Sequence, residues 1–102
     1  MRTFAPAYGQ GVTASVTSSN ISGEIDKNKN RSAIVVTNLG ATTIYVRTGD
    51  SSVAASASTS SSDYPVLAGA QVSLTKDIQH THVAVITASG TSTANVIAGT
   101  GI

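Results

Sequence analysis

The chain has 102 residues, a formal net charge of +1 and no cysteine. This length corresponds to one domain, and the lack of cysteine excludes a disulfide framework and thiolate chemistry. Charged residues make up 11% of the chain, well below the ~25% of an average domain, so there is no strong field to attract nucleic acid. Serine, threonine, alanine and glycine dominate, a composition more typical of an assembly subunit covered by neighbours than of a free enzyme.

The N-terminal segment, MRTFAPAYGQG, shows no strand or helix periodicity. It lacks the continuous apolar region of a signal peptide, and no part of the chain approaches the ~20 apolar residues of a spanning helix. We therefore expect an irregular arm over residues 1–11. The arm holds Arg2, Phe4 and Tyr8, and these two aromatic residues are half of all those in the chain. Either they fold back on their own core, or the arm docks on another subunit with the aromatics as anchors.

Short stretches of alternating or β-branched residues recur after the arm. The most prominent, 33–37 and 43–46, flank Asn38-Leu39-Gly40-Ala41 and predict a β-hairpin whose first strand is covered on both faces. Ile44 and Val46 are expected to face the core. Further strands are expected over 12–16, 64–67, 71–75, 82–87 and 92–98, with the last two forming a second hairpin.

About seven or eight short strands, regular turn signals and no helical period are typical of an all-β fold. We predict an antiparallel β-sandwich with an irregular N-terminal arm, for which a jelly-roll-like arrangement is one way of closing the strands. The expected boundaries are 1–11 for the arm and 12–102 for a single β-sandwich domain. The serine-rich stretch 51–63 is expected to be a long surface loop, mobile unless a neighbour holds it.

One charge cluster, DKNKNR at 26–31, precedes the central predicted hairpin. In an extended conformation Lys27, Lys29 and Arg31 would share one face. Such a face could bind phosphate or a carboxylate-bearing surface, although most runs of this kind are solvated loops.

Groups for catalysis or metal binding are sparse. His80 and His82 would face the same side of a strand, but Asp77 is the sole nearby acid, whereas a metal site needs three or four ligands. A hydrogen-bonding role at the head of a strand fits these histidines better. There is no Gly-x-Ser-x-Gly nucleophile motif or phosphate-binding loop. We predict a protein that is not an enzyme and needs no cofactor or metal.

From residue 32 onward the chain resembles a family of small structural proteins of tailed bacteriophages. The resemblance depends on the order and spacing of several short motifs. They are Val36-Thr37-Asn38-Leu39-Gly40, Ile44-Tyr45-Val46-Arg47-Thr48-Gly49-Asp50, Tyr64-Pro65-Val66-Leu67-Ala68-Gly69, Thr81-His82-Val83-Ala84-Val85-Ile86, Ala88-Ser89-Gly90-Thr91 and Gly99-Thr100-Gly101.

The resemblance implies a virion protein on the capsid surface, made in the host cytoplasm, that decorates or cements the shell by binding the major capsid protein. It further implies a homo-oligomer, a dimer or trimer. No nucleic acid partner is expected because the charge is low, and no membrane partner is expected. The candidate partner-binding residues are Arg2, Phe4, Tyr8, Lys27, Lys29 and Arg31. The alternative is a carbohydrate- or receptor-binding module on a virion tail or fibre. That alternative is less favoured, because the chain has no tryptophan and offers only Tyr45 and Tyr64 within the fold as a sugar platform.

Overall fold

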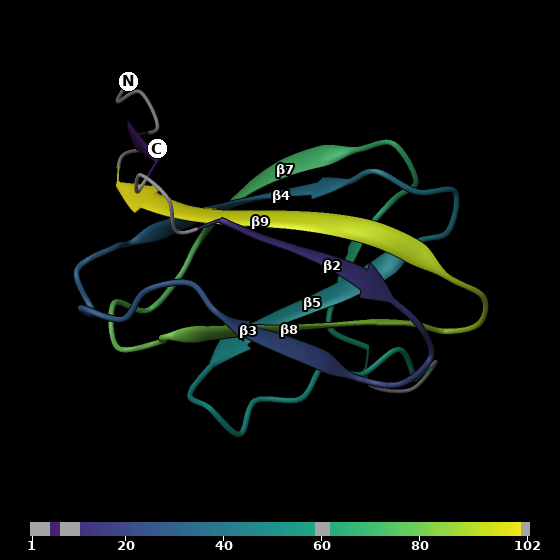
Figure 1. The fold of residues 1–102 in the computed structure, drawn as a ribbon, viewed down its shortest axis with the longest axis horizontal. Helices are drawn as coiled ribbons and strands as arrows, with labels where there is room; N and C mark the ends of the chain where they lie inside the picture. Colours follow the sequence, from purple (N-terminus) through teal and green to yellow (C-terminus); the bar gives the residue numbers. More distant parts are fainter. Residues whose placement is uncertain (1–4, 7–10, 59–61, 101–102) are drawn as a thin grey trace.

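The computed structural model describes residues 5–6, 11–58 and 62–100. Nine strands and no helix form within this part of the chain (Figure 1). The strands are β1 (Ala5–Pro6), β2 (Val12–Val16), β3 (Ile21–Glu24), β4 (Ala33–Asn38), β5 (Ile44–Gly49), β6 (Tyr64–Val66), β7 (Gln71–Thr75), β8 (His82–Thr87) and β9 (Ser92–Thr100).

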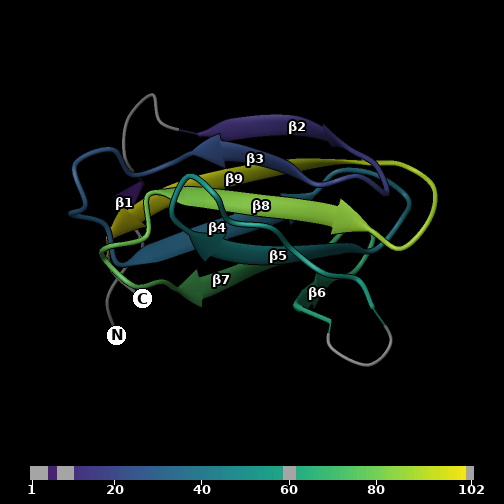
Figure 2. The ribbon, with the colours of Figure 1, turned by 90° about the horizontal axis from the view of Figure 1, so that it is seen from below.

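The strands form two antiparallel sheets that pack face to face (Figures 1 and 2). Sheet A has the order β1-β9-β4-β7, with β2 also paired to β9, and sheet B has the order β3-β8-β5-β6. The prediction of an all-β antiparallel sandwich is confirmed.

The pairing pattern is that of one long hairpin rolled into a sandwich. β2 pairs with β9, β3 with β8, β4 with β7 and β5 with β6, and the pairs alternate between the two sheets. This nesting of eight strands is the jelly-roll arrangement. In it β5 and β6 are consecutive strands that pair with each other, and they are separated by the longest connection among β2–β9.

Both predicted hairpins are wrong. β4 lies in sheet A and β5 in sheet B, so the segment 39–43 crosses between the sheets instead of reversing within one. The connection 88–91 crosses in the same way from β8 to β9. Facing sheets lie ~10 Å apart, a distance that such short segments span as easily as they form a hairpin turn. Neither the length of the loop nor the alternation of the flanking residues distinguishes a hairpin turn from a crossing between the sheets.

The core lies between the sheets and consists almost entirely of aliphatic side chains. Ile44 and Val46 of β5 are buried while Arg47 is exposed, as the alternation predicts. β4 is central, between β9 and β7, but its outer face is only partly covered, since Ala33 is buried while Val35 is half-buried. The buried hydrophobic cluster comprises Val16, Ile25, Ile34, Val36, Ile44, Val46, Val66, Val83, Val85, Ala94, Val96 and Ala98.

A buried asparagine joins the segments at the end of β4. The Nδ2 of Asn38 donates to the carbonyl oxygens of Thr42 (2.8 Å) and Val66 (3.0 Å). Its Oδ1 accepts from Gly40 N (3.1 Å) and Ser92 Oγ (2.6 Å), so the whole amide is satisfied. A Cβ on Gly40 would overlap Ser92 Oγ. This glycine is needed for close approach, while the fully bonded amide fixes the β4–β5 crossing.

The described part of the β5–β6 connection crosses the outer face of sheet B, in front of β8 and β5 in Figure 2. Asn20 holds it, since its Nδ2 donates to Ala55 O (2.9 Å) and its Oδ1 accepts from Ala55 N (2.7 Å). Asp63 accepts from Ser56 N (2.7 Å) and forms an ion pair with Arg47 (2.8 Å). The sandwich itself therefore holds this part of the loop without a neighbouring subunit.

Replacing Val85 by aspartate is expected to lower the free energy of unfolding by more than about 4 kcal/mol, because it buries an unpaired charge between the sheets. Val85 is 4% exposed and lies opposite Val46 in sheet B. Val35→Asp on the outer face of β4 is the control and should cost much less. The measurement is urea unfolding followed by circular dichroism. Equal losses for the two variants would mean that the inner and outer faces are misassigned.

Candidate interaction surface

A buried ion pair organises the β3–β4 loop that carries the cationic cluster. Asp26 and Lys76 are both fully buried, and Lys76 Nζ lies 2.7 Å from Asp26 Oδ2. The same ammonium donates to the carbonyl oxygens of Arg31 (2.8 Å), His80 (2.8 Å) and Asp77 (3.2 Å). One cation thus satisfies carbonyls from two loops, β3–β4 and β7–β8, and joins them.

The carboxylate side of the pair is equally well satisfied. Asp26 accepts from the backbone amides of Asn30 (3.3 Å) and Arg31 (2.9 Å) as well as from Lys76. Burial raises the pKa of Asp26, but these hydrogen bonds outweigh it and hold the pKa below its ordinary value of 3.8. Asp26 is therefore ionised at neutral pH.

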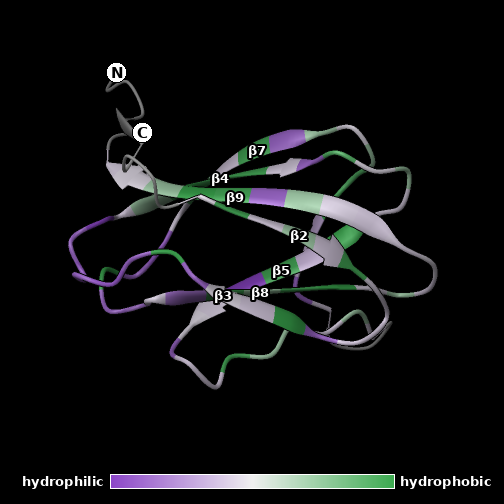
Figure 3. Cartoon of the chain, viewed as in Figure 1, coloured by the Kyte–Doolittle hydropathy of each residue, from purple (hydrophilic) through white to green (hydrophobic). Residues whose placement is uncertain are grey.

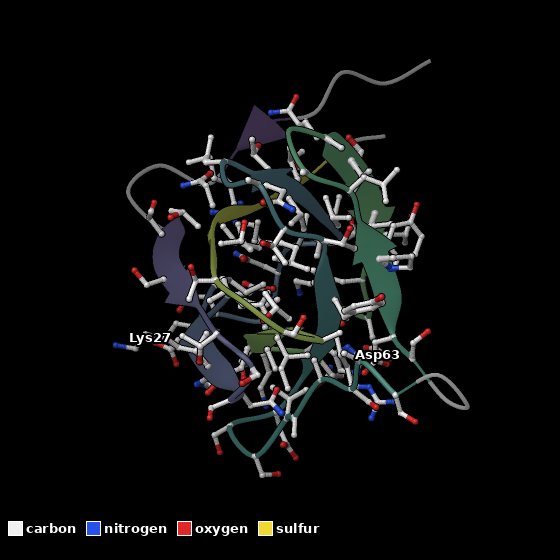
Figure 4. The ribbon with its side chains drawn as sticks, turned by 90° about the vertical axis from the view of Figure 1, so that its right-hand side faces the viewer. Lys27 and Asp63 are labelled. Atoms are coloured by element: carbon white, nitrogen blue, oxygen red, sulfur yellow. The ribbon has the colours of Figure 1, made fainter. Side chains whose placement is uncertain are left out.

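The loop does not present its three cations on one strand face. Residues 27–29 form a turn, with Lys29 N donating to Asp26 O (3.2 Å) and with Lys29 at φ 55°. Lys27 and Lys29 are exposed, and the Lys27 side chain points away from the sandwich (Figure 4). Arg31 is half-buried, and its Nε has no hydrogen-bond partner among the described residues. Two exposed cations therefore project from a turn that the buried pair holds.

The described part of the N-terminal arm lies close to this loop. In β1, Ala5 pairs with Thr100 and Pro6 with Gly99, so the arm is not irregular throughout. Gly99 pairs on its other side with Ala33, at the start of β4. Strands in a sheet are ~4.8 Å apart, which places Pro6 within ~10 Å of the end of the cationic loop. The other arm candidates, Arg2, Phe4 and Tyr8, lie outside the described residues.

The arm does not continue into β2 in a single register. Five residues separate Pro6 from Val12, whereas two residues separate their partners Gly99 and Val96 on β9. β1 is consequently a separate attachment of the arm to the end of β9, and the boundary drawn at residue 11 falls between this attachment and β2.

The opposite end of the sandwich is free of charge, a feature that the sequence analysis missed. The connections 17–20, 39–43, 67–70 and 88–91 meet there and contain no Asp, Glu, Lys, Arg or His. In Figure 3 the loops at this end are mainly pale or green, whereas the β3–β4 and β7–β8 loops are largely purple, with short green stretches. Leu39 and Leu67 are 61% and 65% exposed at this end. The lack of charge in each of these four connections is visible in the sequence, but only the topology shows that they lie at the same end.

The two histidines each hydrogen-bond to a threonine. His80 Nδ1 lies 2.7 Å from Thr48 Oγ1, and His82 Nδ1 lies 2.7 Å from Thr81 Oγ1. His80 precedes β8, so the two rings do not share a strand face. No group of three or more His, Cys, Asp or Glu side chains is placed to hold a metal ion within residues 5–6, 11–58 and 62–100.

A shallow apolar hollow lies between the edge strands β2 and β3. It is lined mainly by aliphatic side chains, among them Val12, Ile21 and Val85. Val12 packs against Gly23. A Cβ added to Gly23 would lie 3.0 Å from Val12 Cγ1. This contact brings the two sheets together at that side of the sandwich.

Comparison with known proteins gives no relative: no protein-family model, curated protein or solved structure matches the chain. In the part of the chain that the structure describes, no helix is long and apolar enough to span a bilayer.

Replacing Lys76 by methionine is expected to lower the free energy of unfolding by about 3–5 kcal/mol, because it leaves the Asp26 carboxylate buried without its cation. The control is the same substitution at the exposed Lys27, which should change stability by less than about 0.5 kcal/mol. Chemical denaturation of both variants gives the comparison. A Lys76→Met protein as stable as the wild type would show that the pair does not stabilise this end.

The ion pair also predicts a dependence of stability on pH. Because folding lowers the pKa of Asp26, its contribution is fully present above the unfolded-state pKa near 3.8 and is lost as the pH falls through the folded value. Unfolding free energies of the wild type and Asp26→Asn should therefore differ most at neutral pH and converge below about pH 4. A difference that stays constant between pH 7 and pH 2 would contradict this assignment.

Proposed function

We propose that the protein is a virion structural protein that decorates or cements the capsid shell of a tailed bacteriophage by binding the major capsid protein. The observation that carries the proposal is the convergence of two separate candidate segments at one end of the sandwich. β1 pairs with the last residues of β9 on one side, and β4, which directly follows the loop bearing Lys27 and Lys29, pairs with the same residues on the other side.

This arrangement suits attachment to a larger surface. A rigid loop, fixed by the Asp26–Lys76 pair, presents exposed cations to carboxylates of the partner. The adjoining arm supplies aromatic anchors. Burial of Phe4 and Tyr8 on the partner would contribute roughly 3–6 kcal/mol before the entropy of ordering the arm is subtracted. Repetition over a shell adds many such contacts through multivalency.

The fold and composition support the same class of protein. Jelly rolls occur in viral capsid proteins, although also in lectins and cupins, so the fold alone does not decide the function. The low charge and the hydroxyl- and methyl-rich surface fit a subunit that is covered by neighbours.

The carbohydrate-binding alternative receives less support. Tyr45 pairs with Pro65 on the outer face of sheet B, whereas Tyr64 lies opposite the inward-facing Val46. The two tyrosines therefore point to different sides of the sheet and do not form one stacking platform for a sugar.

A truncated protein that begins at Gly11 is expected to keep the sandwich and to lose binding to capsids. The test is co-sedimentation with capsids prepared without this protein, with circular dichroism and thermal unfolding as checks of folding.

A second variant, Lys27→Gln with Lys29→Asn, should weaken binding, and more strongly at low salt, because it removes two exposed charges. Asparagine suits the positive φ of Lys29.

Arg47→Gln is the matched control, because Arg47 is an exposed cation on the outer face of sheet B, away from the arm. It should bind like the wild type. If the truncated protein saturates capsids with unchanged affinity, the arm is not the attachment. If the full chain itself does not sediment with capsids, the proposed function is wrong.

A further inference from the structure

We infer that the free edge of β7 is a self-association surface, at which the β7 strands of two copies pair antiparallel and join their A sheets into one continuous sheet. β7 closes sheet A on the side away from β2, and within the described residues it pairs with β4 alone. The inference concerns the protein by itself and goes beyond the proposed attachment to a capsid.

The hydrogen bonds at the two ends of the β4–β7 ladder show which N–H and C=O groups of β7 bond to β4 and which point to the free edge. Asn38 N donates to Ala70 O (2.9 Å), and Lys76 N donates to Ser32 O (2.9 Å). Hydrogen-bonded pairs alternate with non-hydrogen-bonded pairs along an antiparallel ladder. The even-numbered residues of β7 therefore direct their N–H and C=O groups toward β4.

The odd-numbered residues of β7 direct theirs away from the sheet. Gln71, Ser73 and Thr75 each present one N–H and one C=O to the free edge. Their side chains are exposed. The edge is thus a regular row of donors and acceptors centred on Ser73, and the row is self-complementary in the antiparallel sense.

This edge lacks the features by which proteins block strand addition. The segment 64–75 contains no charged residue and no histidine, whereas isolated edges are commonly protected by lysine, proline or a bulge. The neighbouring edge of sheet B differs, because β6 is short and Pro65 at its centre has no N–H. Strand addition is therefore blocked at β6 and left open at β7.

Apolar side chains beside the edge are incompletely covered. Val72 and Leu74 lie opposite the buried Val36 and Ile34, so they face the inside of the sandwich, yet they are only half-buried. Tyr64, on the inner face of the short β6, is 48% exposed. A second copy at the β7 edge would continue the inner face and cover these side chains, which favours a copy of this chain over a charged partner.

The pairing has a two-fold axis at Ser73. Ser73 would face Ser73 of the second copy, and Gln71 would face Thr75, with both N–H···O bonds exchanged in each pair. Val72 would face Leu74 of the second copy in the closer, non-hydrogen-bonded geometry, with Cα atoms about 4.5 Å apart. Like charges do not meet anywhere in this register, and the contact is closed, so it gives a dimer and not a filament.

A single cysteine at the axis tests the geometry directly. The full chain contains no cysteine, so Ser73→Cys introduces one thiol per copy. Hydrogen-bonded antiparallel pairs have Cα atoms about 5.5 Å apart, within the range that a disulfide spans. Under mild oxidation this variant should form a covalent dimer much faster than Ser15→Cys, an exposed position on the edge strand β2. Equal rates for the two variants would overturn the inference.

Analytical ultracentrifugation of the unmodified protein gives the second measurement. The mass should rise with concentration, and Ser73→Pro should abolish the rise without lowering the melting temperature, because it removes an N–H that points away from β4. If Ser73→Pro fails to fold, Ser73→Lys serves instead, since it places two like charges at the axis. A wild type that stays monomeric at all concentrations, or a dimer that survives Ser73→Lys, would overturn the inference.

Discussion

The interaction on which one whole end of the molecule depends is the buried pair Asp26–Lys76. Asp26 follows β3, at one edge of sheet B, and Lys76 follows β7, at the opposite edge of sheet A. The pair therefore joins diagonally opposite corners of the sandwich. Removing two charges from water is expensive, and the structure offsets that expense with hydrogen bonds from two backbone amides to the carboxylate and from the ammonium to three carbonyls. The β3–β4 and β7–β8 loops are fixed relative to each other as a result.

The opposite end is held by neutral groups. There the buried Asn38 amide bonds to a carbonyl of its own loop, to β6 and to β9, with no ionic partner. The result is a molecule with a charged end, which carries β1 and the exposed lysines, and a charge-free end with exposed leucines. Such polarity suits the proposed role as a capsid subunit, because ends that differ in charge favour different neighbouring surfaces.

Strand positions could be predicted closely from the pattern of residues. The stretches 12–16, 71–75 and 82–87 are strands with the expected bounds, and the inward positions of Ile44 and Val46 followed from alternation. Pairing could not be predicted in the same way. β4 and β5 looked like a hairpin because both are β-branched and a short Asn-Gly segment joins them, yet they belong to different sheets. Asn38 and Gly40 serve the crossing between sheets, through a buried amide and a close contact with Ser92.

The candidate interaction surface likewise has features that the sequence predicts and features that it does not. The sequence by itself determined the all-β class, the positions of seven of the nine described strands, the weak charge and the grouping of Lys27, Lys29 and Arg31, because composition and side-chain alternation are local properties. Only the tertiary structure decided which strands pair, that Asp26 and Lys76 meet across 50 residues, and that β1 and the cationic loop share one end. It also decided that the uncharged loops share the other end. These are contacts between distant segments, and a jelly roll forms almost all of its strand pairs between such segments, so no local pattern encodes them.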